Sequence, residues 1–386
     1  VRLVLDQAAA LPDPGWAATS EEQVATGWTP GNIRNRLRTV KCLYRMTQDS
    51  RLLPVGRRLG DALLDPHRYS GWPLSEPHNH GALTSLALLD AAKAFDRPEW
   101  RDVSLTRLRH DIPHVFTRCG MAHEQSSGYQ ALNVSLWTKV ADLVDYRLNG
   151  PKQALRALTR PDGVLEKIGD GDTARTHPNG RSLWCANVGW AANTMGGDTQ
   201  YVLRFGPSMR YHGHLDHGAF TWFALGVPVF SDRGLYDKTR DARFRWAQGM
   251  SAHSVLEPVG VAYDPDTSGR RTGVDAYQLD DSSSGISRRR MVEINRRSAT
   301  VVDTATSINP SQQWIQHWQL APGWTPQGQG AVYTDGTRLS ISCEGGTIVA
   351  VQVESYPDWR QIVPAWDMQC RTTGSSIRLL TRWKIA

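Results

Sequence analysis

The segment 211–218 contains three histidines and an aspartate, the densest group of side chains in the chain that could do chemistry. His212 and His214 are two residues apart, so in an extended segment both imidazoles would lie on one face. Such a pair can bind one metal ion together. Alternatively, one imidazole can bind a metal while the other contacts a substrate. Asp232 and His253 follow as further candidate ligands, and a His/Asp/His set is a normal coordination for zinc. Hydrogen-bonded surface histidines would also account for this spacing.

Two shorter segments could also contribute to a site. Asn79 and His80 stand where a predicted helix begins, so they could cap the helix or donate hydrogen bonds to a ligand. Tyr129 lies just before another predicted helix, after Glu124 and Ser126. Its hydroxyl could transfer a proton, or the ring could simply pack in the core. Both interpretations stay open for each segment.

The elements that must position these residues change type along the chain. Apolar residues recur with a helical period in five segments: 33–44, 55–63, 83–95, 103–116 and 132–144. Pro113 is expected to kink or split the fourth of these helices. Beyond residue 170, short runs rich in Val, Thr, Ile, Trp and Tyr predict strands, for example at 201–205, 300–304, 338–342 and 347–351.

This pattern predicts an α+β chain with two domains. Residues 1–172 would form stacked helical hairpins, and residues 173–386 would form an antiparallel β-sandwich. Candidate residues stand on both sides of the boundary, so we expect the active site in the groove between the two domains.

Composition limits the possible partners. The 386 residues include 44 Lys+Arg against 38 Asp+Glu, and a formal net charge of +6 favours an anionic partner. Tryptophans number 15, more than the 11 tyrosines or 7 phenylalanines, and their flat faces suit stacking on sugar rings as well as core packing. No segment approaches the roughly 18 apolar residues that span a bilayer. No nucleic-acid-binding motif is present either. We therefore expect neither a membrane nor a nucleic-acid partner.

The five cysteines form no CxxC pair, which excludes zinc-finger and disulfide-rich classes. We hypothesise that Cys343 and Cys370 pair within the β-domain. The chain starts at Val1 without an initiator methionine or a signal-peptide core. We therefore expect a mature or trimmed product that lacks its leader.

Taken together, the motifs resemble the heparinase II/III-type polysaccharide lyases, a superfamily that includes alginate lyases. The matching elements, in order, are Asn79-His80, Glu124-x-Ser126-x-x-Tyr129, Pro161-Asp162-Gly163, Gly169-Asp170-x-Asp172, His212-x-His214-x-Asp216, Gly226-x-Pro228-x-x-x-Asp232-x-Gly234-x-Tyr236, and His253. The sequence departs from the family pattern in having Ser254 after His253, where Asn is usual, and in a shorter helical half. The resemblance implies an α/α toroid, here incomplete, followed by the β-sandwich.

The resemblance also implies an activity, which is β-elimination of a uronic-acid polysaccharide such as alginate or a glycosaminoglycan. Asn79 and His80 would neutralise the substrate carboxylate, and Tyr129 would act as general base and then acid. His212 would assist. The remaining implied roles are one structural zinc held by His214, Asp232 and His253, and substrate binding by Gln125, Arg233 and His78. We expect a secreted or periplasmic location.

Two alternatives come from other classes of protein. The basic charge and the tryptophans would also suit a non-catalytic binder of anionic glycans, and the histidines would suit a zinc-dependent hydrolase. The chain contains no HExxH motif, and a hydrolase has no evident use for Asn79, His80 and Tyr129. Only a lyase would create a conjugated double bond, so ultraviolet absorbance of the product separates the three. The particular polymer, endo or exo action and the oligomeric state are left open.

Overall fold

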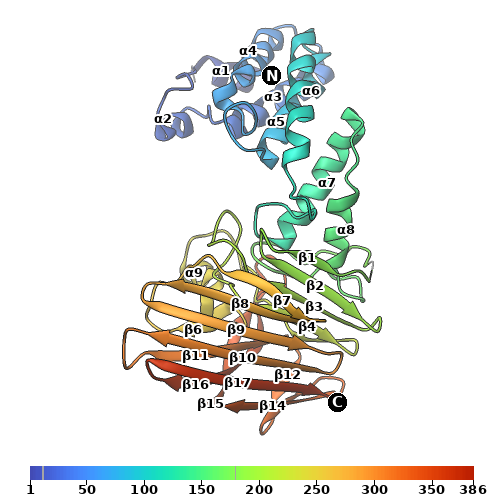
Figure 1. Cartoon of the computed structure of the whole chain (residues 1–386). Coiled ribbons are helices and arrows are strands. Elements are labelled where there is room, and N and C mark those ends of the chain that lie inside the picture. The colour runs from blue at the N-terminus through green and yellow to red at the C-terminus, as the bar shows by residue number, and fades with distance from the viewer. Residues whose placement is uncertain (11–12, 179) are drawn as a thin grey trace. The chain divides into compact units, whose positions relative to one another are not determined.

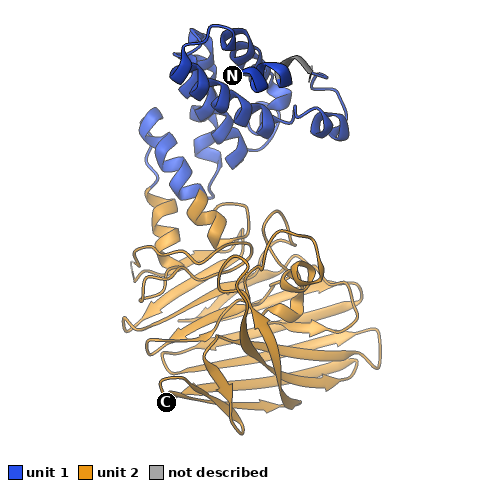
Figure 2. Cartoon of the chain, turned by 180° about the vertical axis from the view of Figure 1, so that it is seen from behind, with its two compact units in different colours: residues 1–117, 133–148 blue, residues 118–132, 149–386 orange. Residues whose placement is uncertain are grey.

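The computed structural model describes residues 1–10, 13–178 and 180–386 (Figure 1). Contacts divide the chain into two compact units, shown in Figure 2. The first comprises residues 1–117 and 133–148, and the second comprises residues 118–132 and 149–386. The predicted fold class is confirmed, because the N-terminal part is helical and the C-terminal part consists of antiparallel sheets. The domain boundary at residue 172 stays a prediction.

The first unit is built from helices. They are α1 (Arg2–Ala10), α2 (Ser20–Ala25), α3 (Pro30–Thr47), α4 (Leu52–Leu64), α5 (Asn79–Ala92), α6 (Pro98–Asp111) and the later turns of α7 (Ser127–Val144). Short 3-10 helices cover Pro66–Arg68 and Ile112–His114. All five helices predicted from periodicity are present. The α-helix α6 ends at Asp111, just before Pro113, as proline requires.

Local sequence explains how these helices begin and pack. The Thr29 side chain accepts a hydrogen bond from the Asn32 backbone and caps α3, and Pro30 occupies the first turn. The buried face of α3 carries Ile33, Leu37 and Val40. The helices α3 and α4 pack against each other, as do α5 and α6, so consecutive helices form hairpins.

The second unit contains two antiparallel sheets. The first has the order β1-β2-β3-β4-β5-β11-β16-β15, with β6 paired to β11, and the second has the order β12-β13-β14-β17-β10-β9-β8-β7. The strands of the first sheet are β1 (Leu183–Cys185), β2 (Trp190–Met195), β3 (Thr199–Arg204), β4 (Phe220–Ala224), β5 (Val227–Phe230), β6 (Leu256–Pro258), β11 (Gln313–Leu320), β15 (Thr347–Ser355) and β16 (Val363–Thr373). Those of the second are β7 (Ser268–Gly273), β8 (Ala276–Ser283), β9 (Ile286–Ile294), β10 (Ser298–Ser307), β12 (Trp324–Pro326), β13 (Gly330–Tyr333), β14 (Arg338–Glu344) and β17 (Ser376–Ile385). The strands predicted at 201–205, 300–304, 338–342 and 347–351 are therefore confirmed.

The core of the sandwich lies between the two sheets. Trp318 from β11 and Trp383 from β17 meet there edge to face, with ring centroids 5.6 Å apart. Residues of β9 alternate between buried and exposed, which is the pattern of a strand with one face on a core. Among the described residues, nine tryptophans are almost completely buried: Trp28, Trp100, Trp137, Trp190, Trp222, Trp314, Trp318, Trp324 and Trp383. These nine therefore pack the interior and are not exposed to stack on sugars.

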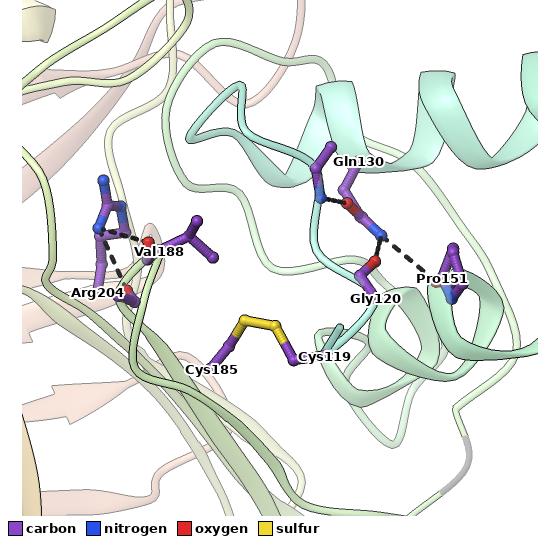
Figure 3. The surroundings of a disulfide bond; sticks show 9 residues. Cys119, Gly120, Gln130, Pro151, Cys185, Val188 and Arg204 are labelled. Carbon is purple, nitrogen blue, oxygen red and sulfur yellow. Dashed lines mark hydrogen bonds between the residues drawn. A yellow bond between two sulfur atoms is a disulfide. The ribbon is translucent and has the colours of Figure 1, made fainter. Parts of the chain in front are cut away.

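The second unit also holds α8 (Asn149–Ala157), α9 (Ala242–Gln248), a 3-10 helix at Met250–Ala252 and the first turns of α7. Two disulfides lie in this unit. The Cys343–Cys370 disulfide, which we hypothesised, joins β14 of one sheet to β16 of the other. The Cys119–Cys185 disulfide was not predicted, and it joins the segment before α7 to β1 (Figure 3). Within the described ranges, none of the helices combines the length and apolar character needed to cross a bilayer.

Candidate active site

Tyr129 and His212 lie face to face in the second unit. Their ring centroids are 3.4 Å apart and the ring planes differ by 9°. Tyr129 stands in the first turn of α7, where the Ser126 hydroxyl accepts a hydrogen bond from its backbone N–H. His212 lies between β3 and β4. Two residues that are 83 positions apart in the sequence are thus in direct contact.

Asp170 joins His212 to His214. One of its carboxylate oxygens lies 2.9 Å from Nδ1 of His212, and the other lies 3.0 Å from Nε2 of His214. Burial acts to raise the pKa of Asp170, but the hydrogen bonds from the two imidazoles outweigh burial and lower it to about 2. Asp170 is therefore a carboxylate at every pH of interest. It fixes the orientation of both rings. On the other side of His212, Nε2 lies 3.5 Å from a carboxylate oxygen of Glu124.

Backbone contacts hold the loop that carries His212 against the segment Gly169-Asp170. The Asp170 N–H donates to the His212 carbonyl at 2.9 Å. At Gly169 the backbone adopts a φ of +68°, and a Cβ there would lie 2.6 Å from the same carbonyl oxygen. Only glycine fits such a close approach with positive φ. This explains the Gly169-Asp170 motif in terms of packing.

Gln125, a predicted substrate-binding residue, is buried and contacts the loop before His212. Its amide nitrogen donates to the carbonyls of Pro207 and Ser208 at 3.0 and 2.9 Å. Its amide oxygen accepts from the Arg210 N–H at 2.7 Å. These three hydrogen bonds use both the nitrogen and the oxygen of the Gln125 carboxamide and position the loop. Substrate binding by Gln125 stays a prediction.

The three predicted metal ligands come together. One potential ligand atom from each of His214, Asp232 and His253 lies within 4.8 Å of the others, and all three residues are buried. Asp232 follows β5 and His253 follows the 3-10 helix Met250–Ala252. His253 Nδ1 lies 2.9 Å from an Asp232 carboxylate oxygen, and the Gly234 N–H donates to the other oxygen at 3.0 Å.

Two buried nitrogens test whether this cluster suits a metal. Nδ1 of His214 and Nε2 of His253 have no hydrogen-bond partner among the described residues. Burying a polar atom without a partner is unfavourable, and a metal ion would satisfy both nitrogens. With a carboxylate as third donor, the set matches the nitrogen and oxygen ligands found at zinc sites. The cluster therefore fits a metal ion.

Lys238 is a site residue that the sequence analysis missed. Its Nζ donates a hydrogen bond to the Tyr129 hydroxyl at 2.8 Å and lies 5.3 Å from the ring centroid. Burial acts to lower the pKa of Lys238, but the bond to Tyr129 and the nearby Asp170 and Asp172 outweigh it and raise the pKa. The only available signal was its position two residues after Tyr236, at the end of the motif that includes Asp232.

Arg233, the second predicted substrate-binding residue, is completely buried. Its guanidinium donates to the Gln319 side chain at 2.6 Å and to the carbonyls of Leu320 and Trp366 at 2.9 and 2.7 Å. Burial lowers the pKa of Arg233 to about 10. These contacts stabilise the junction of β5, β11 and β16, and a role in substrate binding stays a prediction.

The remaining candidates, His78, Asn79 and His80, belong to the first unit at the start of α5. The His78 side chain caps the helix by accepting a hydrogen bond from the His80 N–H at 3.3 Å. Asn79 is buried, and within the described residues its carboxamide oxygen has no hydrogen-bond partner. His80 is exposed. The local arrangement thus combines a helix cap with an exposed imidazole, and the roles of all three in catalysis stay predictions.

Part of the second unit matches a known protein family. Residues 177–260 match the family described as Heparinase II/III-like, C-terminal, and this range contains His212 and the three candidate metal ligands. The resemblance inferred from the motifs is thereby confirmed for this part of the chain. No curated protein matches at a significant level.

Solved structures extend the likeness to the whole fold. A heparinase III aligns with a TM-score of 0.79 and 13% identity, covering 100% of this chain and 72% of its own. The heparan sulfate lyase HepC from Pedobacter heparinus aligns with a TM-score of 0.71 and 16% identity, covering 100% of this chain and 71% of its own. A chondroitinase AC lyase aligns with a TM-score of 0.53 and 9% identity, covering 98% and 75%. The chain therefore has the fold of the heparinase-like polysaccharide lyases.

Proposed function

We propose that this protein is a polysaccharide lyase that cleaves a uronic-acid-containing anionic polysaccharide by β-elimination. The observation that carries the proposal is the stacked pair of Tyr129 and His212, which Asp170 links to the candidate metal ligand His214. The match of residues 177–260 to the heparinase II/III-like family supports it. The net charge of +6 also suits a polyanionic substrate.

The reaction needs a base, an acid and neutralisation of a carboxylate. The proton on C5 of a uronate is weakly acidic while the neighbouring carboxylate is charged, and hydrogen-bond donors on that carboxylate stabilise the carbanion that develops. We assign this role to Asn79 and His80. The Tyr129 phenolate takes the C5 proton, the C4–O4 bond breaks, and a C4=C5 double bond forms. The Tyr129 hydroxyl then returns its proton to O4, which regenerates the phenolate.

His212 assists Tyr129 in this scheme. Its ring lies flat on the tyrosine ring, and its Nδ1 is held by the ionised Asp170. Because Asp170 holds the His212 ring, the stacked Tyr129 ring and its hydroxyl are kept in one orientation. His212 can also serve as a further partner for the substrate carboxylate or as a second base.

We further propose that His214, Asp232 and His253 hold one zinc ion with a structural role. When bound, zinc would supply a cross-link between the loop 211–218 and the ends of neighbouring elements. Asp170 would then orient His214 as an outer-sphere carboxylate, a common arrangement at zinc sites. The residues that act on substrate remain those of the protein itself.

The names of the similar structures suggest which substrates to test first. One is a heparan sulfate lyase and another is a chondroitinase AC lyase. Heparan sulfate and chondroitin sulfate should therefore be tested as substrates before hyaluronan, glucuronan and alginate. The two disulfides favour an oxidising compartment, which supports a secreted or periplasmic location.

The test is to incubate the protein with each polymer and to follow the ultraviolet absorbance of the unsaturated uronate. A rise in absorbance together with shorter chains is the expected result for at least one polymer. Shorter chains without absorbance would indicate a hydrolase. Retention on an immobilised polyuronate with no product from any polymer would indicate a binding protein, and either outcome refutes the proposal.

A further inference from the structure

The loop that carries Lys238 is anchored on both sides of this residue. The Arg360 N–H donates to the Tyr236 carbonyl at 2.8 Å, and the Asp237 carboxylate accepts from the Thr239 N–H at 2.8 Å. The Arg360 guanidinium also donates to Asp237, at 3.3 Å. The backbone at Lys238 is therefore held in place, although the side chain itself is exposed. A side chain on a fixed backbone can present its charge at a defined point.

The point that Lys238 reaches is the oxygen atom that the proposed reaction uses. Its ammonium group lies 2.8 Å from Oη of Tyr129 and donates a hydrogen bond to it. A cationic donor stabilises a phenolate much more than a neutral phenol, because the hydrogen bond then joins opposite charges. Among the described groups near this pair, His212 stacks on the ring, Glu124 and Asp170 contact His212, and Asp172 acts on Lys238.

We propose that Lys238 is a positioning residue that holds the Tyr129 oxygen toward C5 and stabilises the negative charge on this oxygen when Tyr129 acts as the base. This inference rests on the proposed function, since it names the group that prepares the base for β-elimination. When Tyr129 has taken the proton, the ammonium is left facing a neutral hydroxyl, which favours return of that proton to O4. Lys238 keeps its own proton throughout, so no additional co-reactant is required.

Kinetics of two variants and a control test this role. Lys238→Met removes the charge and the donor and keeps an unbranched side chain, whereas Lys238→Arg keeps both. Arg240→Met removes the same charge from an exposed position in the same loop and serves as the control. We expect Lys238→Met to lower kcat about 10- to 100-fold with KM little changed, as for loss of one hydrogen bond to a charged group. Lys238→Arg should recover part of this loss, and Arg240→Met should keep the parental kcat.

A spectroscopic titration reads the same interaction without any substrate. The ultraviolet absorbance of tyrosinate is followed against pH, and the contribution of Tyr129 is the difference between each protein and the same protein with Tyr129→Phe. We expect the Tyr129 transition to move to higher pH in Lys238→Met and to stay near the parental position in Arg240→Met.

Each outcome has a distinct meaning. An unchanged tyrosinate transition in Lys238→Met overturns the inference, even if the parental enzyme is a lyase. A raised KM with unchanged kcat also overturns it, because Lys238 would then bind substrate. If the parental protein yields no unsaturated product, the proposed function fails, while a shifted transition would still establish the Lys238–Tyr129 interaction.

Discussion

Removal of the Cys119–Cys185 disulfide should reduce activity as well as stability. Cys119 begins the segment that leads through Glu124 and Gln125 to Tyr129, and Cys185 lies in β1 (Figure 3). The disulfide thus fixes one end of the segment that carries the proposed base. The double variant Cys119→Ala/Cys185→Ala removes this link without adding bulk.

The size of the effect follows from the two loops that the disulfides close. The sequence separation is 66 residues for Cys119–Cys185 and 27 residues for Cys343–Cys370. Chain entropy then gives about 4 kcal/mol of stabilisation for the first disulfide and about 3.5 kcal/mol for the second. At roughly 2–4 °C per kcal/mol, each double variant should unfold roughly 10 °C below the parental protein.

Loss of either disulfide should lower stability by a similar amount, but only loss of Cys119–Cys185 should lower activity. After loss of Cys119–Cys185, Gln130 still ties the segment through its bonds to the Gly120 and Pro151 carbonyls at 2.9 and 3.3 Å (Figure 3). The segment should therefore remain folded but less precisely placed. Small displacements of a catalytic group are costly, so we expect kcat to fall about 10-fold or more.

The assay combines thermal unfolding by circular dichroism with initial rates of unsaturated product, measured well below both unfolding midpoints. Cys343→Ala/Cys370→Ala is the matched control, because it lies between the sheets away from the segment before α7. It should lose stability but keep kcat within about 2-fold of the parental value. A Cys119→Ala/Cys185→Ala protein with parental kcat, or equal losses of kcat in both double variants, would refute the reasoning.

Four further predictions concern single sites. Tyr129→Phe should lower kcat about 10³-fold or more with little change in KM and in the unfolding midpoint; a parental rate of absorbance increase would end the assignment of Tyr129 as base. His80→Ala should lower kcat more than it raises KM, because the charge on the substrate carboxylate changes toward the transition state, and a pure KM effect would argue against this role. Asp367 and Glu257 outweigh burial and raise the pKa of His317 to about 9, so its contribution to stability, about 3 kcal/mol, should be complete below about pH 6.5 and disappear as the pH rises through 9. Denaturant unfolding of the parental protein and His317→Gln at several pH values checks this, and a difference between the two that does not shrink with rising pH would contradict it. Chelation of the metal should lower the unfolding midpoint, and elemental analysis should find one zinc per chain in the parental protein but not in His214→Ala; a chain free of metal with an unchanged midpoint would exclude the structural zinc.

Much of the fold follows from local sequence. The helical periodicity in 33–44 and 132–144 corresponds to α3 and α7, and alternating short strands correspond to the sandwich. These features were predictable because periodic burial of one face is recorded in neighbouring residues. The order of His214, Asp232 and His253 could likewise be read along the chain, and the structure brings the three together.

What the tertiary structure decided is which distant groups meet. Lys238 contacts Tyr129 across 109 positions, and Asp170 joins His212 across 42. Cys119 pairs with Cys185 across 66. None of these side chains has a neighbour in the sequence that indicates its partner. Their contacts depend on how loops between β-strands return to the start of α7, and that is set by the packing of the whole second unit.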